Sequence, residues 1–306
     1  MLAGLIGLFG FLYVFKHIKD ALLFAYNYAF GGKRDLGALY GRGSYALITG
    51  GSEGMGREFA KAFARRGFGV ILVARNPAKL EEAKSEIERE IPGAKVLICV
   101  FDFSKIDEAE KSDFDFAKMF KLDLEGLDVS VLLNNVGLGR NGYFEEYSIE
   151  ELQNFIKVNC VTQTLLSAYF LRRFARRTSR SAILSLSSQS ATQRMPFYDI
   201  YGASKRYNLH FDQAMRGYYP RVDNYSFTPG HVRTAMTRFK PGFFRISAEE
   251  AVDGAMRNFG GQRGVFSGHW KHELKGLQRF VPECAIQALM RLLPEQFNKP
   301  RAKPSS

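Results

Sequence analysis

From Tyr45 onward, short apolar segments alternate with longer amphipathic ones, and this alternation restricts the fold more than any other feature of the chain. The apolar segments have the length and composition of buried strands: YALIT, GVILVA, KVLICVF, VSVLLN, SAILSLS and NYSF, with a further short strand near Val265. Strands that alternate with helices in this way pair in parallel and carry helices on both faces of the sheet. The sequence therefore predicts an α/β chain built on a doubly wound parallel sheet.

The amphipathic segments predict the helices that cover this sheet. We expect helices at 54–67, 77–91, 104–128, 148–174, 199–218 and 248–258. The second of these has a proline in its first turn, where proline is well tolerated. A further apolar and basic segment, 279–293, is expected to form a helix at a membrane surface.

The chain divides into three parts. Residues 1–40 are expected to form an apolar membrane anchor or interfacial helices, 41–270 the α/β domain, and 271–306 a basic and apolar extension. The first part holds two apolar runs, Leu2–Phe15 and Ala21–Phe30, and each is shorter than the ~20 residues that span a bilayer as a helix. We expect a short signal anchor or a helix hairpin within one leaflet. The alternative is a buried helix that packs on the domain.

Charge and cysteine content narrow the range of partners. The net charge of +12 would suit nucleic acid, but the chain has no recognition motif, zinc spacing or interleaved basic and aromatic stripe. Basic residues instead follow the apolar N-terminal run, which predicts that the main domain lies on the cytosolic side. An anionic membrane surface or an anionic substrate accounts for the remaining charge. The three cysteines show no metal spacing and no disulfide framework, so we expect no metal and a reducing compartment.

The first strand runs directly into a glycine-rich turn, TGGSEGMG, and then into a helix. Glycines let the backbone approach a pyrophosphate closely, and the helix N-terminus supplies free N–H groups and a positive dipole. A glycine turn between a strand and a helix therefore predicts a nucleotide site. The residues of this turn that we assign to the cofactor are Thr49, Gly50, Ser52, Glu53, Gly54, Met55 and Gly56.

The end of the second strand indicates which cofactor binds. A carboxylate there would bond the ribose 2′-hydroxyl of NAD, but Arg75 occupies this place and no acid follows until Glu81. A guanidinium group pairs bidentately with the 2′-phosphate of NADPH. We therefore expect NADPH, with NAD as the alternative cofactor and a merely solvated strand end as the alternative role of Arg75.

Other polar residues follow the remaining strands at the same edge of the sheet, where ligands bind in open α/β folds. Asp102 is expected to accept a hydrogen bond from the adenine amino group. Asn135 and Gly137, in NNVG, follow the fourth strand. The turn after the sixth strand is expected to reach the nicotinamide carboxamide, and its assigned residues are Pro229, Gly230, Val232 and Thr234.

Tyr201 and Lys205, in YGASK, are four residues apart and therefore share one face of their helix. The ammonium group of Lys205 would lower the pKa of Tyr201 and make the phenol a usable general acid for carbonyl reduction. Ser188 ends the fifth strand, where its hydroxyl would donate to the substrate carbonyl. Asn159 lies within a predicted helix, which disfavours such a side chain unless it is capped, solvated or functional.

These features together resemble the short-chain dehydrogenase/reductase family across Tyr45–Ala255, because the motifs and the Pro-Gly turn occur in the family's order and spacing. The resemblance implies a Rossmann-type fold and a catalytic tetrad of Asn159, Ser188, Tyr201 and Lys205. Tyr201 would be the acid and Ser188 would orient the carbonyl. Lys205 would bind the nicotinamide ribose and lower the pKa of Tyr201, and Asn159 would hold a relay water.

Within the family, the chain looks most like the membrane-bound branch of very-long-chain 3-oxoacyl-CoA reductases and 17β-hydroxysteroid dehydrogenases. The similarity rests on NNVG, on Arg75 with NPAKL, on the apolar N-terminus and on HVRTAM. It implies NADPH-dependent reduction of a lipophilic ketone at the endoplasmic reticulum membrane, with a mitochondrial membrane as the alternative. A long-chain 3-oxoacyl-CoA is the expected substrate, and a 17β-hydroxysteroid or a retinoid is the alternative.

Two further expectations concern the surroundings of the site. The segment 233–245, rich in arginine and phenylalanine, would lie over the cleft as a lid, or would contact membrane or partner protein instead. A function of a different class stays open, namely a catalytically silent scaffold subunit. The apolar and basic termini suit docking in a homo-oligomer or a membrane complex.

Overall fold

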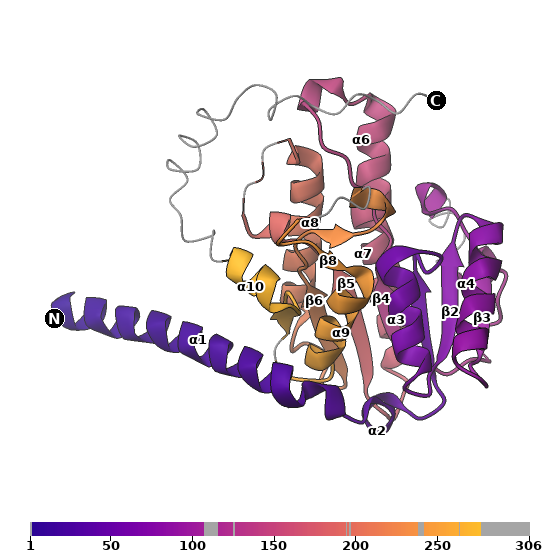
Figure 1. Cartoon of the computed structure of the whole chain (residues 1–306), viewed down its shortest axis with the longest axis horizontal. Helices are drawn as coiled ribbons and strands as arrows, with labels where there is room; N and C mark the ends of the chain where they lie inside the picture. Colours follow the sequence, from indigo (N-terminus) through magenta and orange to yellow (C-terminus); the bar gives the residue numbers. More distant parts are fainter. Residues whose placement is uncertain are drawn as a thin grey trace.

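The computed structural model describes residues 2–106, 116–124, 126–193, 195, 197–237, 242–262 and 264–276. Its centre is a seven-stranded sheet in the order β3-β2-β1-β4-β5-β6-β9, in which every neighbouring pair is parallel (Figure 1). The strands are β1 Tyr45–Thr49, β2 Gly69–Ala74, β3 Val96–Val100, β4 Val129–Asn134, β5 Ser181–Leu186, β6 Val222–Phe227 and β9 Val265–Phe266. The alternation of apolar and amphipathic segments predicted this sheet correctly.

Helices cover both faces of the sheet. Their bounds are α2 Leu36–Tyr40, α3 Gly54–Ala64, α4 Pro77–Glu90, α5 Phe116–Phe120, α6 Ile149–Ile156, α7 Thr162–Phe174, α8 Asp199–Met215, α9 Ala248–Asn258 and α10 Trp270–Gly276. On one face, Phe59 of α3, Leu80 of α4 and Val252 of α9 join the strands in a buried apolar cluster. On the other face, Phe116 of α5 and Phe170 of α7 do the same. The predicted Rossmann-type α/β fold is thus confirmed.

The N-terminal part is one uninterrupted helix, α1 Leu2–Phe30, which extends away from the domain (Figure 1). Of the two expected forms, a short anchor or a hairpin, the hairpin was wrong, because residues 16–20 between the two apolar runs include no proline or glycine that would break a helix. Among the residues with a described structure, no helix combines the length and the apolar character needed to cross a bilayer. The last turns of α1 are fixed to the domain, since the buried Asn27 donates its Nδ2 proton to Oδ1 of Asn258 at 3.1 Å.

Three other segments refine the sequence expectations. The stretch from Ser104 to Asp128 was expected to be one helix, but its described part holds a 3-10 turn that reaches Ile106 and the short α5. Residues 107–115 and 125 lie outside the described residues. The helix expected at 148–174 is present, and a π-helical turn at Lys157–Val161 separates α6 from α7. The segment 279–293 lies outside the described residues. The domain continues past residue 270, because His272 of α10 is fully buried.

The order of the strands positions the candidate site. The chain passes from β1 outward to β3 and then returns to β4 on the other side of β1. Ligands of open α/β sheets bind at such a reversal, beyond the carboxyl ends of the strands. The ends of β1, β4, β5 and β6 therefore bring the glycine turn, NNVG, Ser188 and the Pro-Gly turn to one edge of the sheet.

Candidate active site

The glycine turn between β1 and α3 depends on its glycines for a steric reason. Gly50 and Gly54 have positive φ angles of 65° and 58°, which side chains other than glycine rarely adopt. A Cβ atom at Gly56 would lie 2.1 Å from the carbonyl oxygen of Gly50, so the first turn of α3 packs directly on the glycine backbone. The turn thus leaves a helix N-terminus open at the edge of the sheet, where a pyrophosphate would fit.

Asn135 and Thr49 join this turn to the segment after β4. The Asn135 Nδ2 group donates to the carbonyl oxygens of Thr49 at 2.8 Å and Gly50 at 3.1 Å. The hydroxyl of Thr49 accepts from the backbone N–H groups of Asn135 and Val136 at 2.9 and 3.0 Å. Because Thr49 is fully buried, its side chain holds the turn in place from inside the fold. Both residues are placed to shape the predicted cofactor site.

The residues around the predicted adenosine end are more exposed. Arg75 directly follows β2 and its side chain is exposed to solvent. Glu53, the residue before α3, forms an ion pair with Lys79 at 2.6 Å, and Asp102 accepts a hydrogen bond from the backbone N–H of Ser104 at 3.0 Å. The exposed Arg75 thus lies at the carboxyl end of β2, where the sequence predicted it. Of the other two assigned residues of the turn, Ser52 is buried and Met55 is partly buried against the core.

The segment after β6 closes the opposite side of the predicted cofactor site. A Cβ atom at Gly54 would lie 3.4 Å from Cγ2 of Thr234, so the glycine turn and this segment face each other closely. Val232 is buried and begins the short strand β7 Val232–Arg233, which pairs with β8 Ile246–Ser247. The N–H of Gly230 donates to Nδ1 of His272 at 3.1 Å. That contact with His272 was missed by sequence reasoning, because nothing local to α10 signals it.

Ser188 and Tyr201 meet at the end of β5. Ser188 follows the strand, and its Oγ accepts a hydrogen bond from the backbone N–H of Ser190 at 3.2 Å. Tyr201 lies in the first turn of α8. Burial raises the pKa of Tyr201, and a hydrogen bond with the side chain of Ser188 partly opposes that rise. The two hydroxyl groups are therefore directly coupled, as a shared carbonyl-binding role requires.

The expected effect of Lys205 on Tyr201 is corrected by the structure. The Nζ atom of Lys205 lies 5.9 Å from the centre of the Tyr201 ring and donates to the carbonyl oxygen of Leu186 at 2.8 Å. Burial, not the ammonium, dominates the pKa of Tyr201, which is raised and not lowered. Burial also lowers the pKa of Lys205 to about 8, although Cys160 and Asp212 oppose this effect.

Asn159 lies in the π-helical turn, a feature that often marks functional sites. Its Oδ1 accepts from the N–H of Leu138 at 2.7 Å, and its Nδ2 donates to the carbonyl oxygen of Leu138 at 3.0 Å and to Ser204 at 2.9 Å. A Cβ atom at Gly137 would lie 3.2 Å from Nζ of Lys205 and 3.4 Å from Oδ1 of Asn159. The structure thus brings NNVG, Asn159 and Lys205 together behind Tyr201.

A carboxyl group is buried on the same face of α8, two turns beyond Lys205. Oδ1 of Asp212 accepts from Gln163 and Ser185, each at 2.9 Å, and Oδ2 accepts from Ser226 at 2.8 Å. Burial raises the pKa of Asp212 to about 7, although these hydrogen bonds oppose the rise. Sequence reasoning missed this residue because an Asp in an amphipathic helix is ordinarily solvated.

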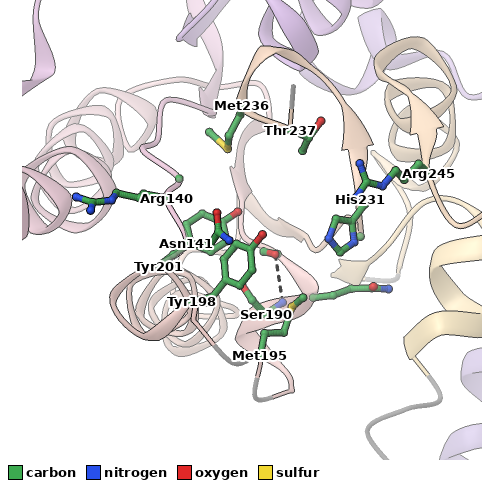
Figure 2. Close-up of a pocket in the computed structure, with 14 residues that line it drawn as sticks. Arg140, Asn141, Ser190, Met195, Tyr198, Tyr201, His231, Met236, Thr237 and Arg245 are labelled. Carbon is green, nitrogen blue, oxygen red and sulfur yellow. Dashed lines mark hydrogen bonds between the residues drawn. The ribbon is translucent and has the colours of Figure 1, made fainter. Parts of the chain in front are cut away.

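A pocket of about 110 Å³ opens in front of the two hydroxyl groups. Figure 2 shows Tyr198 and Tyr201 on one wall and Met236 opposite, with Arg140 on one side and Arg245 on the other. Of the residues that line this pocket, the sequence expectations had assigned Ser188, Tyr201, Gly230 and the 233–245 segment to the site or its surroundings. Its other lining residues were missed: Gly139, Arg140, Asn141, Gln189, Ser190, Met195, Tyr198 and His231. Of the expected lid, 238–241 lie outside the described residues.

Comparisons with known proteins agree with this geometry. A family model described as short chain dehydrogenase matches residues 44–241. A very-long-chain 3-oxoacyl-CoA reductase from Pyricularia oryzae is 31% identical over 208 residues, which are 67% of this chain and 61% of that protein. The 17-beta-hydroxysteroid dehydrogenase type 3 of Homo sapiens is 32% identical over 259 residues, 82% of this chain and 80% of that protein. The chain spans only 48% to 61% of the length of three fungal reductases that it matches.

A solved structure shows the same fold. A short-chain dehydrogenase from Sphingobium yanoikuyae, in complex with NADPH, has a TM-score of 0.65 and 24% sequence identity to this chain. The match covers 86% of this chain and 99% of that one. It supports the Rossmann-type arrangement of the sheet and helices.

Proposed function

Because the chain belongs to the short-chain dehydrogenase/reductase family, and is therefore an oxidoreductase, we propose that it reduces a lipophilic ketone with NADPH. The observation that carries this proposal is the meeting of two hydroxyl groups, those of Ser188 and Tyr201, at the wall of one pocket. Lys205 and Asn159 both lie next to Gly137, and Nζ of Lys205 is 5.9 Å from the centre of the Tyr201 ring. This arrangement can bind a carbonyl oxygen and give it a proton.

The residues at the sheet edge fit a dinucleotide. Gly56 lets the first turn of α3 pack directly on the backbone of Gly50, which keeps the helix N-terminus at the turn where a pyrophosphate would lie. The exposed Arg75 would hold the 2′-phosphate, which favours NADPH over NAD. Support from outside the chain comes from the Sphingobium yanoikuyae dehydrogenase, which binds NADPH. Asp102, Asn135 and the turn at Pro229 complete the proposed site.

When bound, the nicotinamide would supply the hydride to the carbonyl carbon. The Tyr201 hydroxyl gives its proton to the carbonyl oxygen, and Ser188 donates a second hydrogen bond to that oxygen. A proton from solvent restores Tyr201 after each turnover. Lys205 holds a positive charge next to Tyr201, and Asn159 positions Leu138 and therefore the segment that carries Gly137.

The proposed substrate is a long-chain 3-oxoacyl-CoA. The pocket combines apolar lining, from Met195, Tyr198 and Met236, with an arginine on each of two sides: Arg140, which is ion-paired with Glu151, and Arg245. The apolar lining suits an acyl chain, and the arginines would attract the phosphates of coenzyme A. The similarity to very-long-chain 3-oxoacyl-CoA reductase supports this choice. The second candidate is a 17β-hydroxysteroid, supported by the similarity to the human enzyme.

We also propose that α1 places the enzyme on a membrane. Most of its described large apolar side chains are exposed, for example Phe11 at 65% and Leu22 at 66%. A continuous exposed apolar surface of this kind marks a site of contact with membrane or with another protein. Residues 1–40 would thus be a membrane-associated part, 41–270 the reductase domain and 271–306 an extension, with the endoplasmic reticulum as the proposed location.

The test is NADPH oxidation by the purified full-length chain, with a long-chain 3-oxoacyl-CoA and with a 17-ketosteroid. We expect turnover with the acyl-CoA, a preference for NADPH over NADH, and a loss of about 10²–10⁴-fold in Tyr201→Phe. Turnover of the steroid alone would select the second candidate. Equal and negligible rates in wild type and Tyr201→Phe with both substrates would instead favour a silent scaffold subunit.

A further inference from the structure

A second cavity, of about 990 Å³, lies at the edge of the sheet opposite the candidate active site. It opens at the amino ends of β6 and β9, where Val222 and Gly264 line it. Leu23 and Tyr26, from the last turns of α1, form another wall, together with Arg34. The cavity is thus built where the apolar helix α1 joins the domain, and nothing in the proposed reduction uses it.

Three guanidinium groups line this cavity, and they differ in their partners. Arg180 forms an ion pair with Asp223, whose Oδ2 also accepts from the Tyr40 hydroxyl at 3.0 Å. Arg34 donates to the carbonyl oxygen of Arg257 at 2.7 Å and to the side chain of Asn27. Arg216 donates to the carbonyl oxygen of Asn224 at 3.4 Å. Among the described residues, no carboxylate forms an ion pair with Arg34 or Arg216, although the buried Asp212 lies close enough to Arg216 to raise the pKa of its guanidinium. The cavity therefore keeps two guanidinium groups that no described carboxylate contacts directly.

The glycine-rich loop between α9 and β9 holds these two arginines in place. A Cβ atom at Gly261 would lie 3.0 Å from Cζ of Arg34, and one at Gly264 would lie 2.0 Å from Cζ of Arg216. Each guanidinium therefore lies against bare backbone, a position that a side chain at either glycine would block. Burial lowers the pKa of Arg216, although Asp212 opposes the effect, so this guanidinium is partly desolvated at the cavity wall.

The position of the cavity decides between possible anions. Phosphate oxygens pair bidentately with guanidinium groups, and anionic headgroups attract cations next to a membrane-associated helix. In the sequence, Leu22 and Phe30 of α1 flank the cavity-lining Leu23 and Tyr26. Their side chains are exposed, at 66% and 55%. An acyl chain that follows α1 would bring its headgroup phosphate to Arg34 and Arg216.

We propose that this cavity binds the phosphate of an anionic phospholipid headgroup, and that Arg34 and Arg216 are its ligands. The site seats the root of α1 on the membrane surface and sets the orientation of the domain. This inference rests on the membrane placement of α1 proposed above and is independent of the ketone that the enzyme reduces.

The first experiment is vesicle flotation of the full-length chain. We expect stronger binding to phosphatidylcholine vesicles that contain phosphatidylserine than to phosphatidylcholine alone. The double variant Arg34→Gln/Arg216→Gln should lose about tenfold or more in binding to the anionic vesicles and keep its binding to the neutral ones. Equal binding of the wild type to both vesicles would overturn the headgroup site. Failure of the wild type to bind either would overturn the membrane placement together with it.

A matched control separates a site from general charge. Arg65→Gln/Arg89→Gln removes the same charge from the residue that follows α3 and from α4, and neither residue lines the cavity. We expect this control to keep most of the anionic preference, and an equal loss in both double variants would contradict the proposal. NADPH-dependent reduction in detergent should be unchanged in both, because the cavity lies at the other edge of the sheet.

A measurement on the wild type alone covers the case in which the cavity variant fails to fold. Soluble dihexanoyl phosphatidylserine should raise the Tm of the full chain more than dihexanoyl phosphatidylcholine does. Inorganic phosphate at the same concentration should raise it less, because it lacks the acyl chains that contact α1. An equal or larger rise with inorganic phosphate would identify a soluble phosphate as the ligand and refute the lipid assignment.

Discussion

The Nζ atom of Lys205 lies 5.9 Å from the centre of the Tyr201 ring and donates its hydrogen bond to the carbonyl oxygen of Leu186. The pair therefore shares one face of α8 without a direct bond between ammonium and phenol. Burial raises the pKa of Tyr201, so the phenol keeps its proton across the working range of pH. Burial lowers the pKa of Lys205 to about 8, so Lys205 is the group of this pair that titrates there.

This relationship predicts the pH dependence of the reaction. We expect kcat/KM to fall as pH rises above about 8, because Lys205 then loses the charge that would hold the cofactor. The check is a pH profile of kcat/KM with a ketone substrate. In Lys205→Arg the guanidinium stays charged, so the remaining activity should lack this fall. A wild-type profile that stays flat well above pH 8 would refute the assignment.

Arg75 is expected to select the cofactor. Arg75→Gln should raise the KM for NADPH by about ten- to a hundredfold, because one charge-assisted pair with the 2′-phosphate is lost. The KM for NADH should change little. Arg89→Gln, an exposed arginine on α4, is the control and should affect neither constant. An equal effect of Arg75→Gln on both cofactors would mean that Arg75 does not contact the 2′-phosphate.

Gly56→Ala tests the glycine turn. Its new Cβ atom would lie 2.1 Å from the carbonyl oxygen of Gly50, so the turn must shift at a cost of about 1–3 kcal/mol. We expect a lower Tm and a loss of the Tm rise that NADPH produces in the wild type. Gly10→Ala is the control, since nothing lies within 4 Å of a Cβ atom there. Normal stabilisation of Gly56→Ala by NADPH would exclude close contact between turn and cofactor.

Asp212 is expected to make stability depend on pH. Burial raises the pKa of Asp212 to about 7 in the fold, well above the ordinary value of an Asp carboxyl (about 3.9), so the folded state holds a proton that the unfolded state releases. The contribution of the protonated Asp212 carboxyl to folding stability is therefore complete below about pH 4 and is lost as pH rises through 7. In Asp212→Asn, the free energy of unfolding should depend less on pH in this range. The variant should therefore lose less stability than the wild type as pH rises toward 7.

Urea unfolding of both proteins between about pH 5 and pH 7 measures the difference, which should reach a few kcal/mol. Lys205 does not interfere in this range, because its pKa of about 8 lies above it. The nearby Arg216 stays charged throughout. Parallel profiles for the two proteins would show that Asp212 is ionised in the fold.

The sheet and much of the site could be predicted because they follow from local patterns. Alternating strands and helices determine a parallel sheet, and a parallel sheet brings every strand's carboxyl end to one edge. Ser188 and the glycine turn follow those ends directly, so their meeting required no knowledge of packing. Tyr201 and Lys205 share a helix face for an equally local reason.

Contacts between distant segments were not predictable in this way. The hydrogen bond of His272 to Gly230 joins α10 to the turn after β6, and the fold alone brings them together. The same holds for Arg140 and Tyr198 in the pocket. The raised pKa of Tyr201 depends on burial, which a helical spacing of four residues does not report. The single helix α1 was missed because charged residues were read as a boundary, although charge alone does not break a helix.

The most direct test of the central claim follows the hydride itself. NADPH carrying deuterium at the transferable position of the nicotinamide is incubated with the full-length chain and a long-chain 3-oxoacyl-CoA, and the product is analysed by mass spectrometry. The account predicts a 3-hydroxyacyl-CoA with one deuterium on the carbinol carbon in wild type, and a strongly reduced yield in Tyr201→Phe. A reduced product without deuterium, or an equal yield from Tyr201→Phe, would contradict it.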